Sequence, residues 1–206
     1  MTTVLPQAAG VILAGGQSRR MGQPKARLAI GGEPLLRRVS RRLLLAVPQV
    51  VVVGPPELSE LVPDLVVVQD LHPRMGPLAG IEAGLLSVTD ELIFVVACDM
   101  PFINPGLVRA MLEYAQSDPE ADIVALPSPK GSGEAMMEHL HAAYRRSCLP
   151  AVTRSVAGGS YALHQLFSQL RVRTFPETLA RQLDPAGRST LNANSPDDWE
   201  RVLELL

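Results

Sequence analysis

The sequence contains little cysteine. Among its 206 residues only Cys98 and Cys148 are cysteines, and they form neither a CxxC pair nor a Cys/His cluster. Their spacing argues against a zinc site and against a disulfide framework, and it fits the reducing cytoplasm. We therefore expect both thiols to be packing residues.

The chain also lacks an excess of one charge and any long apolar run. Lys and Arg number 19 against 21 Asp and Glu, a formal net charge of -2, so no overall field attracts nucleic acid or an anionic membrane. No apolar stretch approaches the length of a bilayer span, and residues 1–10 lack the pattern of a signal peptide. We expect a soluble, cytoplasmic protein that binds neither nucleic acid nor membrane.

Two familiar phosphate-binding motifs are absent. The spacing GxGxxG does not occur, and the pattern GxxxxGK[ST] fails because Lys25 follows Pro24 and precedes an alanine. Residues 10–25 instead read GVILAGGQSRRMGQPK, where an apolar run ends in Gly15 and Gly16 and three cations follow, namely Arg19, Arg20 and Lys25. Bare backbone lets amide groups approach a ligand, and cations neutralise phosphate oxygens. A tight turn with a solvated basic face explains these residues equally well, but a loop that follows the first strand of an α/β sheet favours ligand binding.

The hydrophobic pattern predicts an α/β fold. Hydrophobic residues make up 47% of the chain, which is enough for one sizeable core. Continuous runs of valine, isoleucine and leucine, typical of strands buried on both faces of a parallel sheet, lie at 10–14, 49–53, 65–69, 91–97 and 121–126. Apolar residues at helical spacing occupy 34–46, 77–88 and 104–117 between them. We expect a three-layer, doubly wound and mostly parallel sheet with helices on both faces, in one domain over residues 1–206.

The pattern is looser after residue 127. Residues 128–134 read as a flexible turn, 142–152 and 161–170 as helices, and 171–175 as a late strand. The tail from Ser195 to Leu206 predicts a closing helix, with Ser195 as N-cap and Pro196 at the first helical position.

Five segments together resemble one family. The stretch LAGGQSRRMGQPK fits the pattern LAGGxSxRMGxxK of the nucleotidyltransferases that act on molybdopterin, most closely the molybdenum cofactor guanylyltransferases. The likeness continues through GGEPLLRRV, MGPLAGIEAGL, ACDMPFINPGLV and LNANSPDDW, so it spans nearly the whole chain in order. The resemblance implies a Rossmann-like fold and transfer of GMP from GTP to the phosphate of molybdopterin, with release of pyrophosphate and a requirement for Mg²⁺. It divides the domain into a nucleotide-binding part, 1–126, and an acceptor-side part with the closing helix, 127–206.

Two aspartates end predicted strands. Asp99 closes the run from Leu92 and should lie at the carboxyl edge of the sheet, where a carboxylate can hold the divalent ion that nucleotidyl transfer needs. Capping of the next helix is the other explanation, but Asn104 and Pro105 already supply a cap. Asp70 ends the preceding strand, and an ordinary turn explains it as well as a ligand role does.

The resemblance assigns roles to individual residues. Asp99 matches the magnesium ligand and Asp70 a nucleotide-binding aspartate, while Lys25 and Arg20 match phosphate ligands. The backbone that contacts base and ribose corresponds to Leu13, Ala14 and Gly15, next to Gly16. Asn192 and Asn194 match asparagines near the acceptor side of the cleft, although both can equally shape a turn.

Departures from the family pattern and alternatives remain. Gly54 stands where the family often has a nucleotide-binding asparagine, so any contact there must come from backbone. The four histidines show no metal-ligand spacing, and we expect them at the surface or in the cleft. The alternatives are a cytidylyltransferase, a transferase of the same fold with another phosphorylated acceptor, and a non-catalytic nucleotide-binding cofactor chaperone. The resemblance also implies contacts with other molybdenum cofactor biosynthesis proteins or with the molybdoenzymes that accept the product.

Overall fold

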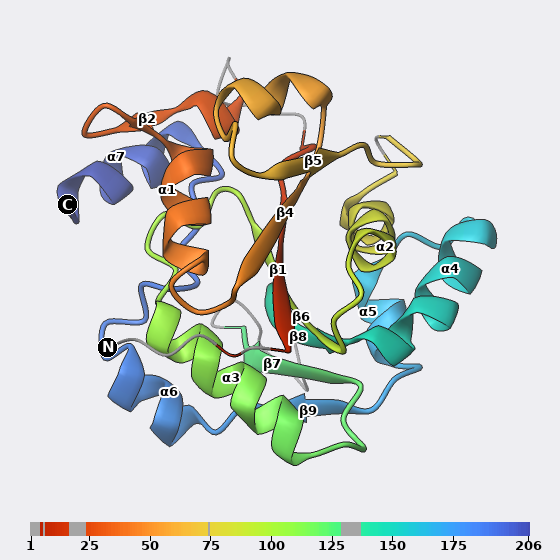
Figure 1. The fold of residues 1–206 in the computed structure, drawn as a ribbon. Coiled ribbons are helices and arrows are strands. Elements are labelled where there is room, and N and C mark those ends of the chain that lie inside the picture. Colours follow the sequence, from red (N-terminus) through yellow and green to blue (C-terminus); the bar gives the residue numbers. More distant parts are fainter. Residues whose placement is uncertain (1–4, 6, 17–23, 74, 129–136) are drawn as a thin grey trace.

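The computed structural model describes residues 5, 7–16, 24–73, 75–128 and 137–206 (Figure 1). Within these residues, seven strands form one sheet in the order β5-β4-β1-β6-β8-β7-β9. Their bounds are β1 Ala8–Leu13, β4 Gln49–Val53, β5 Val66–Val68, β6 Leu92–Ala97, β7 Ile123–Pro127, β8 Met137–Arg145 and β9 Val172–Thr174. Only β8 runs against the others, because β5, β4, β1 and β6 pair in parallel, β8 is antiparallel to both β6 and β7, and β7 and β9 are parallel. The predicted mostly parallel sheet is confirmed.

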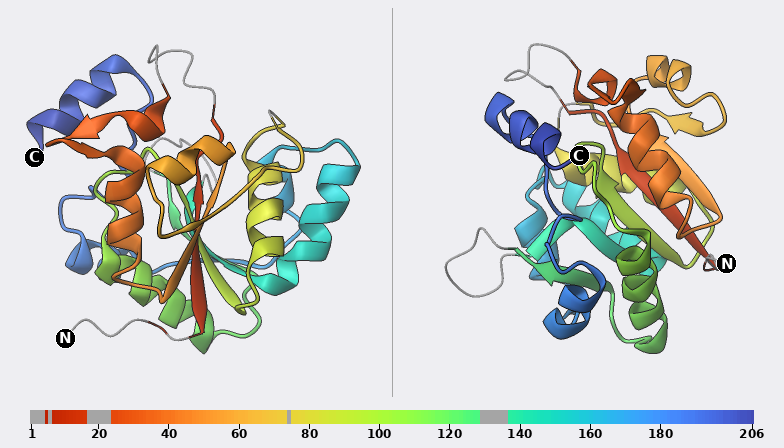
Figure 2. Two further views of the ribbon diagram at one scale, coloured as in Figure 1. Left: turned by 45° about the horizontal axis from the view of Figure 1, so that its top comes forward. Right: turned by 90° about the vertical axis from the view of Figure 1, so that its left-hand side faces the viewer.

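Helices cover both faces of this sheet, as Figures 1 and 2 show. Alternate residues of each central strand enter two separate cores, so that Ile12 packs on one face and Val11 on the other. One core contains α1 Leu35–Leu43, α3 Pro105–Ser117 and α7 Pro196–Glu204, and the other contains α2 Pro77–Ser87, α4 Leu149–Ala157 and α5 Leu163–Phe167. Burial on both faces is the reason that the strand sequences are apolar at every position.

Several predicted boundaries agree closely with the structure. The run at 49–53 is β4, and the helical patterns at 77–88 and 104–117 are α2 and α3. Asn104 caps α3 by accepting hydrogen bonds from the amides of Gly106 and Leu107. The closing helix α7 begins with a capping box in which Ser195 and Asp198 satisfy each other's backbone amides.

The predicted helix at 142–152 is wrong in its first half. Residues up to Arg145 belong to β8, and α4 starts at Leu149 after a short 3₁₀ turn, Arg146–Cys148. Ala142, Ala143 and Tyr144 suit a helix locally, but all three are almost completely buried between the two helical layers. Tertiary burial therefore overrides the helix propensity of this segment.

The C-terminal part of the chain returns to the N-terminal part. The short hairpin of β2 Ala29–Ile30 and β3 Glu33–Pro34 lies beside α7, as Figures 1 and 2 show. A further helix that the sequence did not predict, α6 Glu177–Leu183, lies near α3. Within the described residues, no helix has both the length and the apolar character to cross a membrane. Cys98 and Cys148 are buried and unpaired, as expected of packing residues.

Candidate nucleotide pocket

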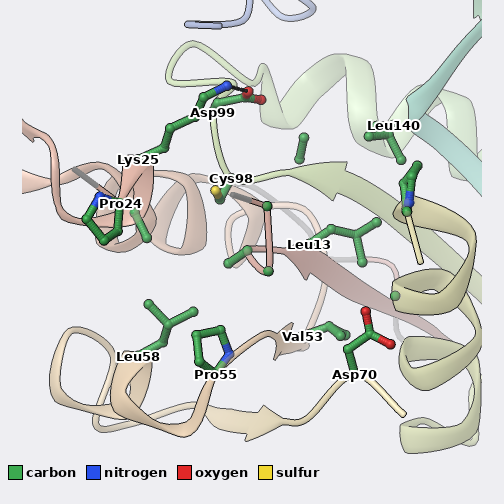
Figure 3. Close-up of a pocket in the computed structure, with 18 of the residues that line it drawn as sticks. Leu13, Pro24, Lys25, Val53, Pro55, Leu58, Asp70, Cys98, Asp99 and Leu140 are labelled. Atoms are coloured by element: carbon green, nitrogen blue, oxygen red, sulfur yellow. Dashed lines mark hydrogen bonds and ion pairs between the residues drawn. The ribbon is translucent and has the colours of Figure 1, made fainter. Parts of the chain in front are cut away.

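A pocket of about 1020 Å³ opens at the carboxyl ends of the parallel strands β1, β4 and β6. Figure 3 shows that its walls come from segments far apart in the chain. The lining residues predicted from the sequence are Leu13, Ala14, Gly15, Gly16, Lys25, Asp70, Asp99 and Asn194. Ligands of open α/β sheets are bound at this edge, so the pocket is the candidate functional site.

Lys25 and Asp99 meet in the pocket although 74 residues separate them. The ammonium Nζ of Lys25 lies 2.7 Å from Oδ2 of Asp99 and 2.7 Å from Oδ1 of Asn194. Asp99 follows β6, and Lys25 opens a short 3₁₀ turn, Lys25–Arg27. Their side chains are 12% and 18% exposed, so each charge is partly desolvated and depends on the other.

The turn that carries Asp99 is held from two directions. From α1, the Nε atom of Arg38 donates to the carbonyl of Pro101 at 3.1 Å, and that of Arg42 donates to the carbonyl of Ile103 at 2.7 Å. From the C-terminal segment, the amide of Ala193 donates to the carbonyl of Asp99 itself at 3.0 Å. The two arginines were not predicted as part of the site, because only the fold brings their guanidinium groups to this turn.

Asp70 lines the same pocket on the side opposite the Lys25 and Asp99 pair (Figure 3). Its Oδ1 accepts a hydrogen bond from the amide of His72 at 2.8 Å, which shapes the turn after β5. Nearby, Gly76 is the N-cap of α2, its φ of 90° favours glycine, and no side chain of the described residues caps this helix end. Gly76, Pro77 and Gly80 line the pocket, so the positive end of the α2 dipole lies at its wall.

Apolar residues complete the walls. Those that the sequence did not single out are Pro24, Ala26, Val53, Pro55, Leu58, Ala97, Cys98 and Leu140, and they are joined by Gly76, Pro77 and Gly80 of the predicted GPLAG segment. Cys98 is the residue before Asp99, and burial, together with the adjacent Asp99 carboxylate, raises the pKa of its thiol to about 12. A thiol with that pKa stays protonated, so Cys98 acts here as a wall and not as a nucleophile.

Three predicted residues are not placed in this pocket. Arg20, like Arg19, lies outside the described residues. Asn192 is half-buried two residues before Asn194 and does not line the pocket. Gly54 lies between the pocket residues Val53 and Pro55. A Cβ at Gly54 would lie 2.8 Å from Cδ1 of Leu58 and 3.2 Å from the backbone of Ala14. A side chain at Gly54 would therefore crowd Leu58 and the backbone of Ala14, and the amide of Gly54 donates to the carbonyl of Val68.

The histidine prediction is wrong for His141. Its side chain is completely buried on β8, with Nε2 2.7 Å from the hydroxyl of Ser189 and the ring packed edge-on against Phe94. Burial lowers the pKa of His141 to about 4, so the ring is neutral at physiological pH. Tyr144 is buried in one core, and Trp199 packs against the other.

The sheet is mostly parallel with helices on both faces, and a cation, a carboxylate and bare backbone surround one pocket at its strand ends. This is the arrangement of an open α/β protein that binds its ligand at the strand ends. A family model described as MobA-like NTP transferase domain matches residues 10–185. The chain belongs to that family.

Named relatives cover almost the whole chain. The probable molybdenum cofactor guanylyltransferase of Pelotomaculum thermopropionicum is 38% identical, over 93% of this chain and 90% of its own. The molybdenum cofactor guanylyltransferase of Desulfosudis oleivorans is 33% identical, over 94% and 93%. Among solved structures, molybdopterin-guanine dinucleotide biosynthesis protein A of Archaeoglobus fulgidus superposes with a TM-score of 0.78 at 27% identity, covering 96% of this chain and 97% of that one.

Proposed function

We propose that this protein is a molybdenum cofactor guanylyltransferase, which transfers GMP from GTP to the terminal phosphate of molybdopterin and releases pyrophosphate. The names of its relatives support this activity, since those relatives align over nine-tenths or more of both chains. The observation that carries the proposal is the meeting of Lys25 and Asp99 in a pocket at the strand ends.

We propose roles for the site residues from the family resemblance, and the positions of the described ones in the pocket support them. Lys25 binds phosphate oxygens of GTP, and Arg20, outside the described residues, assists it. Asp70 binds the nucleotide across the pocket from this pair, and the backbone of Leu13, Ala14 and Gly15 contacts base and ribose.

The two glycines support close approach of a ligand. Neither Gly15 nor Gly16 has a positive φ. Within the described part of the chain, a Cβ at Gly16 would meet no heavy atom within 4 Å, and one at Gly15 would meet only the Cα of Gly54, at 3.9 Å. Among the described residues, neither backbone conformation nor packing requires glycine at these positions, which supports the proposal that a ligand approaches the backbone there.

The site suits Mg²⁺, which we propose as the cofactor. Mg²⁺ in nucleotide enzymes is commonly held by one or two carboxylates plus substrate phosphates and waters. The described residues contain no cluster of three or more metal-ligating side chains, but the carboxylate of Asp99, beside Lys25 in the pocket, fits this pattern. When bound by Asp99, the ion would supply positive charge that neutralises the reacting phosphates.

The residues of the chain act mainly by positioning and by charge. The attacking phosphate of molybdopterin is already ionised at neutral pH, so no general base has to remove a proton. Lys25 stabilises the charge that develops on the phosphate oxygens, and the apolar walls exclude water from the reacting groups. The glycine backbone and Asp70 hold the nucleotide for in-line attack on the α-phosphorus.

Mass spectrometry of the product tests this proposal. The protein is incubated with Mg²⁺, molybdopterin and either GTP or CTP, and the reaction is stopped within the first turnovers. Molybdopterin guanine dinucleotide together with pyrophosphate is the expected product. The cytosine dinucleotide would assign the cytidylyltransferase activity instead, and binding of nucleotide without any product would indicate a cofactor chaperone.

The cellular setting is proposed on the same basis. The two thiols do not form a disulfide, which is compatible with the reducing cytoplasm. The partners of this protein would be the proteins that supply molybdopterin and the molybdoenzymes that receive the finished cofactor.

A further inference from the structure

We propose that Asn194 is a positioning residue for Lys25 and not a ligand of the acceptor. The inference rests on the proposed function, because it concerns how the phosphate-binding lysine is held. It differs from the sequence-based expectation, which placed Asn194 near the acceptor side of the cleft. The carrying contact is the hydrogen bond from Nζ of Lys25 to Oδ1 of Asn194, at 2.7 Å across 169 residues of sequence.

The amide suits this task because it accepts a hydrogen bond without cancelling charge. A lysine ammonium sits on a flexible four-carbon stem and must be held to act at one point. Asp99 also holds Lys25, but its negative charge offsets the positive charge of the ammonium. In the proposed reaction, Asp99 binds Mg²⁺ instead. Asn194 then remains as a neutral acceptor for Lys25, which keeps its full positive charge for the phosphates.

Asn194 is itself fixed by its own segment. Its backbone amide donates to Oδ2 of Asp198 at 3.0 Å, and the same carboxylate oxygen completes the capping box of α7. One residue earlier, Ala193 is completely buried and bonds to the carbonyl of Asp99. The amide side chain of Asn194 therefore leaves a short, doubly anchored stretch of backbone that also contacts the turn bearing Asp99.

The start of this segment is anchored in the core. Ser189 is completely buried. Its hydroxyl accepts a hydrogen bond from the backbone amide of Asn104 at 2.8 Å and lies 2.7 Å from Nε2 of His141. These contacts connect β8, the start of α3 and the C-terminal segment. Only residues 190–193 lie between the buried Ser189 and Asn194. The fold therefore sets the position of the Asn194 side chain.

GTP affinity measured without molybdopterin distinguishes the two candidate roles of Asn194, which are positioning Lys25 and binding molybdopterin. We would titrate Mg²⁺ and GTP calorimetrically into wild type, Asn194→Leu, Lys25→Met and the double variant. Asn194→Leu removes the acceptor oxygen at nearly constant volume, and we expect GTP affinity to fall roughly tenfold. The double variant should bind GTP within about twofold of Lys25→Met, because the two residues act through one contact.

Controls and contrary outcomes are defined for the same titration. Gln169→Leu makes the same kind of amide-to-isobutyl change on an exposed side chain outside the pocket, and should leave GTP affinity unchanged. The inference would be overturned if Asn194→Leu bound GTP as tightly as wild type or more tightly. It would also be overturned if the fold-loss of affinity in the double variant equalled the product of the two single fold-losses. If wild type binds another nucleoside triphosphate in place of GTP, the proposed preference for guanine is wrong. The comparison of single and double variants is then made with that nucleotide. A wild type that binds no triphosphate contradicts both proposals.

Discussion

Asp99 is mostly buried, and contacts from several elements hold its side chain and the turn that carries it. The carboxylate side chain is 12% exposed, its Oδ2 accepts from Lys25, and two arginines and Ala193 hold the turn that carries it. A mostly buried carboxylate that lines a pocket is placed to interact with a cation bound there.

Replacing Asp99 by asparagine should abolish transfer while the fold is retained. The amide keeps the size of the side chain and can still accept from Lys25, but it cannot supply the charge that a divalent ion requires. We expect turnover to fall by about 100-fold or more, measured as pyrophosphate release, with an unchanged far-UV circular dichroism spectrum. Asp197→Asn, at an exposed carboxylate in the first turn of α7, is the matched control; near-wild-type turnover in Asp99→Asn would refute the assigned role.

His141 gives the protein a specific sensitivity to acid. Its pKa is about 4 in the folded state because burial disfavours the charged ring, with a smaller opposing effect of Asp184. Above a pH of about 6.5 the ring is neutral in both states and contributes no pH dependence. Between that pH and about 4 the unfolded chain binds a proton that the folded protein does not, so stability falls as the pH falls.

The His141→Gln variant should lose less stability in acid than wild type. From a pH of about 7.5 to about 4, the free energy of unfolding of wild type should fall by about 3 kcal/mol more than that of the variant. Urea unfolding at matched pH values gives both free energies. Parallel losses in the two proteins would show that the buried ring is not the group that titrates.

At the scale of elements, α2 and β1 pack at their closest through glycine. A Cβ at Gly84 would lie 2.5 Å from Cγ1 of Val11, a completely buried and branched side chain. At Gly80, one turn earlier, the added atom would lie 3.2 Å from Cδ2 of Leu13, the end of a flexible side chain. The same substitution therefore meets different resistance at two positions of one helix.

Gly84→Ala should destabilise the protein and Gly80→Ala should not. Alanine improves helix propensity by about 1 kcal/mol at either site, but overpacking against Val11 typically costs about 1–3 kcal/mol. We expect a net loss of about 1–2 kcal/mol for Gly84→Ala in urea unfolding, with Gly80→Ala close to wild type. Equal free energies of unfolding for the two variants would contradict the close approach of α2 to β1.

The strands buried on both faces could be predicted from sequence, whereas β8 could not. The valine runs of β4 and β6 are continuous and apolar, so local pattern and tertiary environment agree. In β8 the residues His139, His141 and Arg145 interrupt any apolar run, and the alanines favour a helix. His141 and Arg145 are buried only because Ser189 and backbone carbonyls on other elements are available to them, which is information that no local window contains.

At the scale of the whole molecule, the site brings together four distant parts of the chain. Sequence motifs predicted Lys25, Asp70 and Asp99 near one sheet edge, and the structure places all three around one pocket. Their binding roles stay predictions. The hydrogen bond between Lys25 and Asn194 could not be predicted, because it depends on α7 returning to the hairpin of β2 and β3.

Nucleotide binding should stabilise the whole fold selectively. A ligand that binds only the folded state adds about 2.7 kcal/mol at a concentration 100 times its Kd. We expect Mg²⁺ with GTP to raise the Tm by several degrees and the same concentration of CTP to raise it less, as followed by differential scanning fluorimetry. A larger shift with CTP would favour the cytidylyltransferase alternative.

The reversed direction of β8 has a consequence for engineering. Because it runs against its neighbours, its first residues reach the ligand edge of the sheet, where Leu140 lines the pocket, and its last residue, Arg145, lies at the far edge beside Glu91. Attempts to redesign substrate preference along this strand should therefore begin at Leu140, whereas changes toward Arg145 would alter the rigidity of the scaffold.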